Sequence, residues 1–245
     1  MIKVLVGKSR TMTLINPTDP AIEYIKESHQ MSISQKKEFS LNEEIQVYLK
    51  DKITNDIDLG SVLHRLKSTF PLHLFSEVDA IFVGMFEEFE DRDINALYKD
   101  GAIYVSSEQD NIQDMLDDII HEIAHSLEIP YGGLIYGDGK VEQEFLSKRL
   151  KLYEIIKNEG LKPKRKTFLS PEYSEEMDDY LYKEVGYDRL NFIVSSYGLF
   201  SSAYAATSLK EYFANGFEHF FLDDRSDLEE CCPELYRKIE ELYEL

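Results

Sequence analysis

Hydrophobic positions along the chain divide it into a mixed first part and a helical last part. An apolar run at residues 80–86 predicts a buried strand, and 95–98 and 102–106 predict two strands joined by an Asp-Gly turn. A further short strand is predicted at residues 2–6. Apolar residues recur at helical spacing over 41–54, 58–68, 110–128, 140–158, 208–222 and 233–244. This order of strands and helices predicts an α+β fold.

The segment 110–128 has the clearest amphipathic pattern, and it contains the sequence HEIAH at residues 121–125. Pro130 and the glycines at 132–133 predict the end of this helix. His121 and His125 lie one turn apart on one face, so both imidazoles can reach a single tetrahedral ion. Because two neutral imidazoles leave room for a third ligand and a water, the motif predicts one Zn²⁺. The alternative is a pair of solvated histidines.

Glu122 is the candidate general base of this motif. It is rotated by about 100° from His121, which keeps its carboxylate off the ion but close to a water on the ion. A carboxylate in that position can take a proton from the water at neutral pH.

A zinc site of this kind needs a third protein ligand. The H-E-x-x-H sequence has no H-x-x-G-x-x-H type of continuation, so we expect a carboxylate on a later helix. Glu211 and Glu218 lie seven residues apart, nearly on one helical face. Charged residues on helices are usually solvated, and we interpret Glu218 mainly in this way.

Residues 208–217, with the sequence SLKEYFANGF, resemble a second-helix signature of the form E-x-F-A-x-x-F. It is typical of gluzincin metallopeptidases related to the catalytic domain of anthrax lethal factor and to the clostridial Pro-Pro endopeptidases. The resemblance covers about residues 80–128 and 195–222. It implies that Glu211 is the third zinc ligand.

The resemblance also implies a zincin-like fold. In that fold a small mixed sheet and the active-site helix form an N-terminal lobe, and a mainly helical lobe follows. The peptidase domain would then span residues 76–245, with 129–195 as an insertion between the two metal-ligand helices. Residues 1–75 would form an N-terminal region of unassigned role that packs on the core.

Two further residues take their roles from the resemblance. Tyr204, seven residues before Glu211, matches a tyrosine that stabilises the oxyanion or the leaving amine; the alternatives are a packing role for Tyr204 and a catalytic role for Tyr197. Asn215 stands where the family often has an acidic residue that orients a ligand histidine. Its amide oxygen can accept a ring N–H, but it raises the basicity of the imidazole less than a carboxylate does.

The strand region resembles the substrate-binding edge strand of thermolysin-type gluzincins. An exposed edge presents unpaired N–H and C=O groups, to which an extended peptide can add. The resemblance implies that substrate contacts come from Asn95, Ala96, Leu97 and Tyr98.

We therefore predict a zinc metalloendopeptidase that acts on a peptide or protein substrate, with Glu122 as general base. One alternative is a zincin-fold binding or structural module of a toxin or virion whose chemistry has been lost. A third is a zinc hydrolase that acts on a non-peptide amide. The set of ligands, base and tyrosine is complete, which favours the enzyme because loss of chemistry usually leaves a gap in such a set.

Charge adds an expectation about the substrate. The 245 residues carry a formal net charge of −20, which argues against nucleic acid as a partner because phosphate binding needs a basic face. Residues 86–128 hold 13 acidic residues against Arg92 and Lys99, a local charge of −11. One interpretation is that this acidity lines a cleft and attracts a substrate with basic residues. The alternative is that the acidic residues serve solubility alone.

The sequence contains no apolar run near the roughly 18 residues of a membrane span, and it begins without a signal-peptide pattern. We therefore expect no membrane partner, and a location in the cytoplasm, in a virion or outside the cell by leaderless secretion. The adjacent Cys231 and Cys232 give no disulfide framework.

Overall fold

A computed structural model describes residues 37–41, 44–92 and 94–245, and the strand predicted at 2–6 lies outside these residues. The strands are β1 (Lys37–Leu41), β2 (Ile45–Leu49), β3 (Ala80–Val83), β4 (Ala96–Lys99) and β5 (Ala102–Val105). The first α-helices are α2 (Leu59–Thr69), α3 (Glu87–Arg92), α4 (Ile112–Tyr136), α5 (Lys140–Asn158) and α6 (Arg165–Phe168). They are followed by α7 (Glu175–Asp179), α8 (Tyr187–Ser196), α9 (Leu209–Leu222), α10 (Arg225–Cys231) and α11 (Pro233–Tyr243). Short turns of other helix types are η1 (Thr54–Asp56), η2 (Leu72–Phe75), η3 (Tyr180–Val185) and η4 (Tyr204–Ala206).

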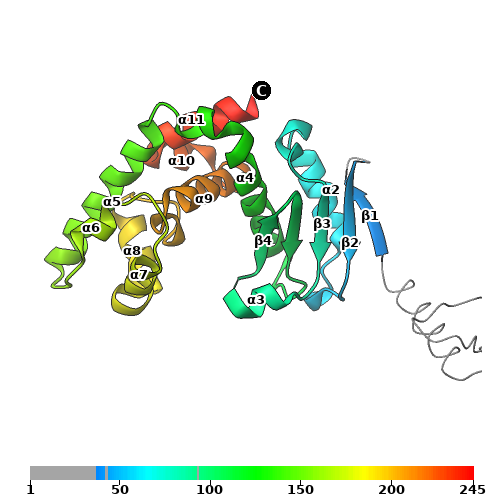
Figure 1. Cartoon of the computed structure of the whole chain (residues 1–245), viewed down its shortest axis with the longest axis horizontal. Helices are drawn as coiled ribbons and strands as arrows, with labels where there is room; N and C mark the ends of the chain where they lie inside the picture. Colours follow the sequence, from blue (N-terminus) through cyan, green and yellow to red (C-terminus); the bar gives the residue numbers. More distant parts are fainter. Residues whose placement is uncertain (1–36, 42–43, 93) are drawn as a thin grey trace, which may run out of the picture.

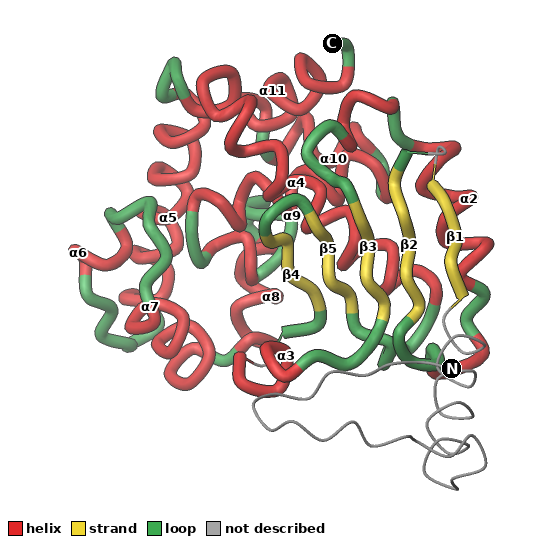
Figure 2. Tube along the Cα trace, turned by 45° about the vertical axis from the view of Figure 1, so that its right-hand side comes forward, coloured by secondary structure: helices red, strands yellow, loops and turns green. Residues whose placement is uncertain are grey.

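The five strands form one mixed sheet in the order β1-β2-β3-β5-β4 (Figure 2). The three central strands are parallel, and both β1 and β4 are antiparallel to their neighbours. Asp100 and Gly101 have φ values of 51° and 82°, as expected for the tight Asp-Gly turn between β4 and β5. The α+β class and the small mixed sheet are thus confirmed, and β4 is an edge strand.

The helix predicted over residues 41–54 is wrong, because this segment contains β2. Ile45 and Val47 are buried and the residue between them is exposed, which is the period-two pattern of a strand. In so short an apolar run, the sequence alone does not distinguish this pattern from that of a helix. Pairing with β3, in the register Val47 with Ile81, decides between the two. Residues 37–75 accordingly contribute two strands to the sheet that carries β4 and β5.

Helix α4 continues to Tyr136, beyond the end predicted at Pro130. A proline inside a helix removes one hydrogen bond and strains the preceding turn. Here the last turn is held by the fully buried Ile135 and by the Tyr136 hydroxyl, which donates to Glu128 Oε1 (2.5 Å). These contacts outweigh the cost of the proline, and they connect the end of α4 to the segment that carries the HEIAH sequence.

Figure 1 shows the sheet and α2 on one side of the molecule, helices α5 to α8 on the other, and α4 and α9 between them, with α10 and α11 above α9. Phe213 and Phe217 of α9 are fully buried, and the Phe213 ring packs 6.1 Å from that of Tyr136. On another face of α9, a Cβ on Gly216 would lie 2.3 Å from Leu235 of α11, so glycine allows this close approach. Among the described residues, no helix combines the length and the apolar character needed to cross a membrane.

Arg149 of α5 holds the segment that leads into α9. Its side chain is fully buried, and Nη1 donates to the carbonyls of Ala206 (3.1 Å) and Thr207 (3.2 Å). Nη2 donates to the carbonyl of Thr167 (2.7 Å). Burial lowers the pKa of Arg149 to about 10, which leaves the guanidinium charged at neutral pH. The position of η4 and of the first turn of α9 therefore depends on this cation.

Replacing Arg149 by methionine tests that dependence. We expect Arg149→Met to lower the free energy of unfolding by about 2–4 kcal/mol, because three carbonyls lose a charged donor while the cost of burying the guanidinium disappears. Urea denaturation measures the change. The matched control is Lys151→Met on the exposed face of α5, for which we expect a change within about 0.5 kcal/mol. Equal effects of the two substitutions would contradict the assignment.

Candidate metal centre

The imidazoles of His121 and His125 converge on one point between α4 and α9. Their Nε2 atoms lie 3.0 Å apart, as the spacing of one helical turn allows. Glu211 in the first turn of α9 reaches the same point: its Oε2 lies 3.0 Å from His121 Nε2, and its Oε1 lies 3.6 Å from His125 Nε2. The structure thus brings together the three residues predicted as zinc ligands.

The start of α9 fixes the position of Glu211. Ser208 caps the helix, since its hydroxyl accepts a hydrogen bond from the Glu211 N–H (3.2 Å). Ser-x-x-Glu is the spacing of a capping box, in which the glutamate would bond back to the cap. The Glu211 carboxylate turns to the two histidines instead.

The three groups fit a zinc ion in their chemistry and their spacing. Two imidazole nitrogens and one carboxylate oxygen are a common ligand set of catalytic zinc, which keeps its fourth position open. Ligand atoms bound at about 2.0–2.1 Å in a tetrahedron lie about 3.3 Å from one another, close to the separations of 3.0 and 3.6 Å found here. Glu211 Oε2 is buried and makes no hydrogen bond of good geometry among the described residues, although His121 Nε2 lies 3.0 Å away; a cation at this point would contact both atoms.

A second carboxylate supports each histidine from its other ring nitrogen. His121 Nδ1 lies 2.5 Å from Glu218 Oε1, and His125 Nδ1 lies 3.5 Å from Glu128 Oε2. Carboxylates in this position fix the orientation of a ligand imidazole and raise its basicity. The interpretation of Glu218 as a solvated residue is therefore wrong. Sequence analysis missed Glu128, although its spacing of three residues from His125 places both on one helical face.

The pKa values show that this cluster attracts positive charge. Burial favours neutral histidine, but the carboxylates of Glu211 and Glu218 raise the pKa of His121 well above its usual value. Burial also lowers the pKa of His125, but the carboxylates of Glu128 and Glu211 outweigh this effect and raise the pKa to about 9. Burial opposes the charge of Glu211 too, yet the two imidazoles lower its pKa to about 2. A divalent cation would supply the positive charge that protons otherwise supply.

Glu122 lies beside the cluster and lines the same cavity as His121. Its Oε2 accepts a hydrogen bond from the backbone N–H of Tyr98 in β4 (2.5 Å). Burial raises the pKa of Glu122, against the lowering effect of the neighbouring His125 and His121. The carboxylate is thus held between α4 and the edge strand, with a pKa nearer to neutrality, as proton transfer requires.

Tyr204 lies close to the cluster, in the turn η4 that Arg149 holds. Its ring centre is 6.4 Å from that of His121. Partial burial and the carboxylate of Glu211 raise the pKa of Tyr204, so its hydroxyl stays protonated and can donate a hydrogen bond. Tyr197, the alternative, is exposed at the end of α8 and lines neither of the two cavities beside the cluster.

The expected role of Asn215 is not what the structure shows. Its amide oxygen accepts from the Ser202 hydroxyl (2.5 Å), and its amide nitrogen donates to the carbonyl of Glu211 (2.9 Å). The carboxylate that contacts His121 Nδ1 comes from Glu218, one turn further along α9. Asn215 therefore braces the backbone of α9 rather than a ligand imidazole.

Part of the predicted substrate-binding strand borders the cluster. Asn95 and Ala96 line a cavity of about 380 Å³ together with His121 and Glu122. Leu97 is not part of this lining, and the N–H of Tyr98 is already bonded to Glu122. Residues two apart in a strand direct their backbone groups to the same side, so the backbone of Ala96 also faces away from β5.

Comparison of the chain with protein-family models, with curated proteins and with solved structures finds no match. The geometry of His121, Glu122, His125 and Glu211 is therefore the evidence on which a function has to be inferred.

Proposed function

We propose that this protein is a zinc-dependent endopeptidase with a zincin-like fold, as the resemblance to gluzincin metallopeptidases implies. One observation carries the proposal. Two imidazoles spaced by one turn of α4 and a carboxylate from α9 converge within 3.6 Å, beside a glutamate that is held against an edge strand. This arrangement combines the ligands of a catalytic zinc with a base and a surface for an extended peptide.

His121, His125 and Glu211 would hold the ion, with Glu218 and Glu128 fixing the two imidazoles. Bound zinc supplies Lewis acidity, which polarises a carbonyl group and lowers the pKa of water to about 7. Glu122 takes a proton from the attacking water and delivers it to the departing amine, so one carboxylate acts first as general base and then as general acid. The Tyr204 hydroxyl donates a hydrogen bond to the negative charge that develops on the carbonyl oxygen.

The edge strand gives the proposal a direction for the substrate. The Tyr98 N–H is already bonded to Glu122, whereas no hydrogen bond among the described residues occupies the Ala96 backbone on the side away from β5. An extended peptide that pairs with this side of β4 would therefore use the backbone of Ala96. The peptide bond next to this pairing would then lie over the cavity lined by His121 and Glu122. Hydrolysis of an amide at that point agrees with the position of the base.

Replacing Glu122 by glutamine separates metal binding from catalysis. We expect Glu122→Gln to keep one zinc per chain and to lower peptide hydrolysis by about 10³-fold, since the amide cannot accept the proton. Elemental analysis and cleavage of a peptide library measure the two effects. Glu108→Gln on the exposed surface should change neither. Hydrolysis that persists in the Glu122 variant would rule out this residue as the base.

Removing a ligand should abolish the metal site. We expect His125→Ala and Glu211→Ala to lose stoichiometric zinc, and with it the rise in Tm that zinc gives to the wild-type chain, because an ion that binds only the folded state stabilises it. Calorimetry with and without zinc tests this expectation. The control is His64→Ala on the exposed face of α2, which should bind zinc as the wild type does. Unchanged zinc binding in both ligand variants would disprove the proposed site.

Glu218 is expected to matter for affinity rather than for coordination. Glu218→Gln should weaken zinc binding by about 10–100-fold, because the amide orients the ring of His121 less strongly than a carboxylate does. Competition with a zinc chelator measures the affinity. The exposed Glu229→Gln removes the same charge from the surface and should leave the affinity within about twofold. If the two variants behave alike, the contact with His121 has no role in metal binding.

A further inference from the structure

A second cavity, of about 620 Å³, lies beside the metal centre and meets the first at Ile94 and Tyr204. Glu211 forms part of its lining, so the cavity reaches the proposed ligands. Its lining includes residues of α7, η3 and α8 and, far from them in the sequence, Ile94 in the loop between α3 and β4. In Figure 1, α7 and α8 lie on the helical side of the molecule, and α3 and β4 lie on the sheet side. A peptide that crosses the metal centre from the first cavity would enter this second one.

Tyrosine rings make up most of the wall of this cavity. Tyr173, Tyr182 and Tyr187 come from the segment that separates α4 from α9, and Tyr204 completes the set. Tyr173, Tyr182 and Tyr204 are among the most exposed aromatic residues of the described chain, at 55%, 60% and 41%. Exposed aromatic side chains that gather in one concave site are typical of a binding surface.

Asp178 places a fixed carboxylate among these rings. Its Oδ1 accepts a hydrogen bond from the Tyr187 hydroxyl (3.0 Å), and its Oδ2 accepts one from Tyr173 (3.4 Å). A carboxylate offers about four acceptor positions, so two remain for a ligand. The described residues that line the cavity include no lysine or arginine that would compete for them.

We propose that this tyrosine pocket, formed by Tyr173, Tyr182, Tyr187, Tyr204 and Asp178, is a subsite that binds a lysine or arginine side chain of the substrate. The inference rests on the proposed peptidase function. A cation in the pocket pairs with Asp178 and lies against the faces of the tyrosine rings, two interactions that favour it over a neutral side chain of the same shape. Asp178 supplies the negative charge that attracts the side chain, because the proposed zinc ion would neutralise the charge of Glu211.

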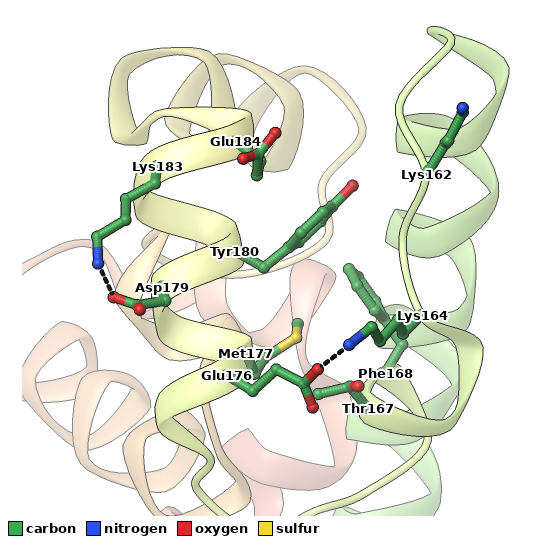
Figure 3. A pocket seen from close by; sticks show the side chains of 10 residues that line it. All are labelled: Lys162, Lys164, Thr167, Phe168, Glu176, Met177, Asp179, Tyr180, Lys183 and Glu184. Carbon is green, nitrogen blue, oxygen red and sulfur yellow. Dashed lines mark hydrogen bonds and ion pairs between the residues drawn. The ribbon is translucent and has the colours of Figure 1, made fainter.

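The neighbouring carboxylate gives a matched control. Asp179 belongs to the same helix, but its Oδ1 pairs with Lys183 Nζ (2.6 Å). Asp179 and Lys183 line a separate cavity of about 280 Å³, shown in Figure 3, in which Lys164 pairs with Glu176. Adjacent residues of α7 therefore serve two different cavities. Asp178→Asn and Asp179→Asn remove the same charge from the chain, and only the first alters the tyrosine pocket.

The test compares arginine with citrulline, its neutral isostere, in the binding of capped fluorescent nonapeptides. One set carries arginine at a single position that is moved along an otherwise neutral random sequence, and the second set carries citrulline there. Fluorescence anisotropy with the zinc-loaded full chain, in the Glu122→Gln background, measures binding without turnover. We expect arginine to bind about tenfold more tightly at one position. Asp178→Asn should reduce this preference to less than about twofold, and Asp179→Asn should leave it intact.

Equal binding of arginine and citrulline at every position would overturn the inference. An equal loss in the two aspartate variants would show a general effect of charge and no pocket. Hydrolysis by the wild-type chain is scored separately. Cleavage without any preference for arginine contradicts the subsite alone, whereas arginine binding through Asp178 without cleavage contradicts the peptidase function and keeps the site.

Discussion

Negative charge is concentrated where helices α4 and α9 meet, and the described residues there favour positive charge that balances it. Two imidazoles are surrounded by the carboxylates of Glu128, Glu211 and Glu218, and Glu122 is close by. Without an ion, protons provide the balance, which is why the pKa values of both histidines are raised. A divalent cation would balance the same charge with better geometry, because three ligand atoms already point at one position.

Much of the rest of the fold serves to hold this crossing. Tyr136, beyond the proline of α4, bonds to Glu128, and Glu128 in turn contacts His125. From the other side, Arg149 fixes the carbonyls of η4 just before Glu211. The edge strand is tied in through the hydrogen bond between Tyr98 and Glu122. Elements far apart in the sequence are thus joined by a few polar contacts around one point.

The sequence predicted what depends on local spacing. His121, Glu122 and His125 share one helix, so their relative positions follow from 3.6 residues per turn, and α5 lies where its periodicity placed it. Contacts between elements were harder to predict. The contact of Glu218 with His121 depends on how α9 crosses α4, and the pairing of β2 depends on β3, neither of which leaves a local pattern. Glu211 was identified through a family resemblance, and the tyrosines around Asp178 through the structure alone.

The central claim is that one zinc ion binds between α4 and α9 and uses these three residues. Anomalous X-ray diffraction from crystals of the zinc-loaded protein, collected on both sides of the zinc absorption edge, tests it most directly. The account predicts one peak per chain, within about 2.0–2.2 Å of His121 Nε2, His125 Nε2 and a carboxylate oxygen of Glu211. A zinc-loaded crystal with no peak at this position, or with its peak at other residues, would contradict it.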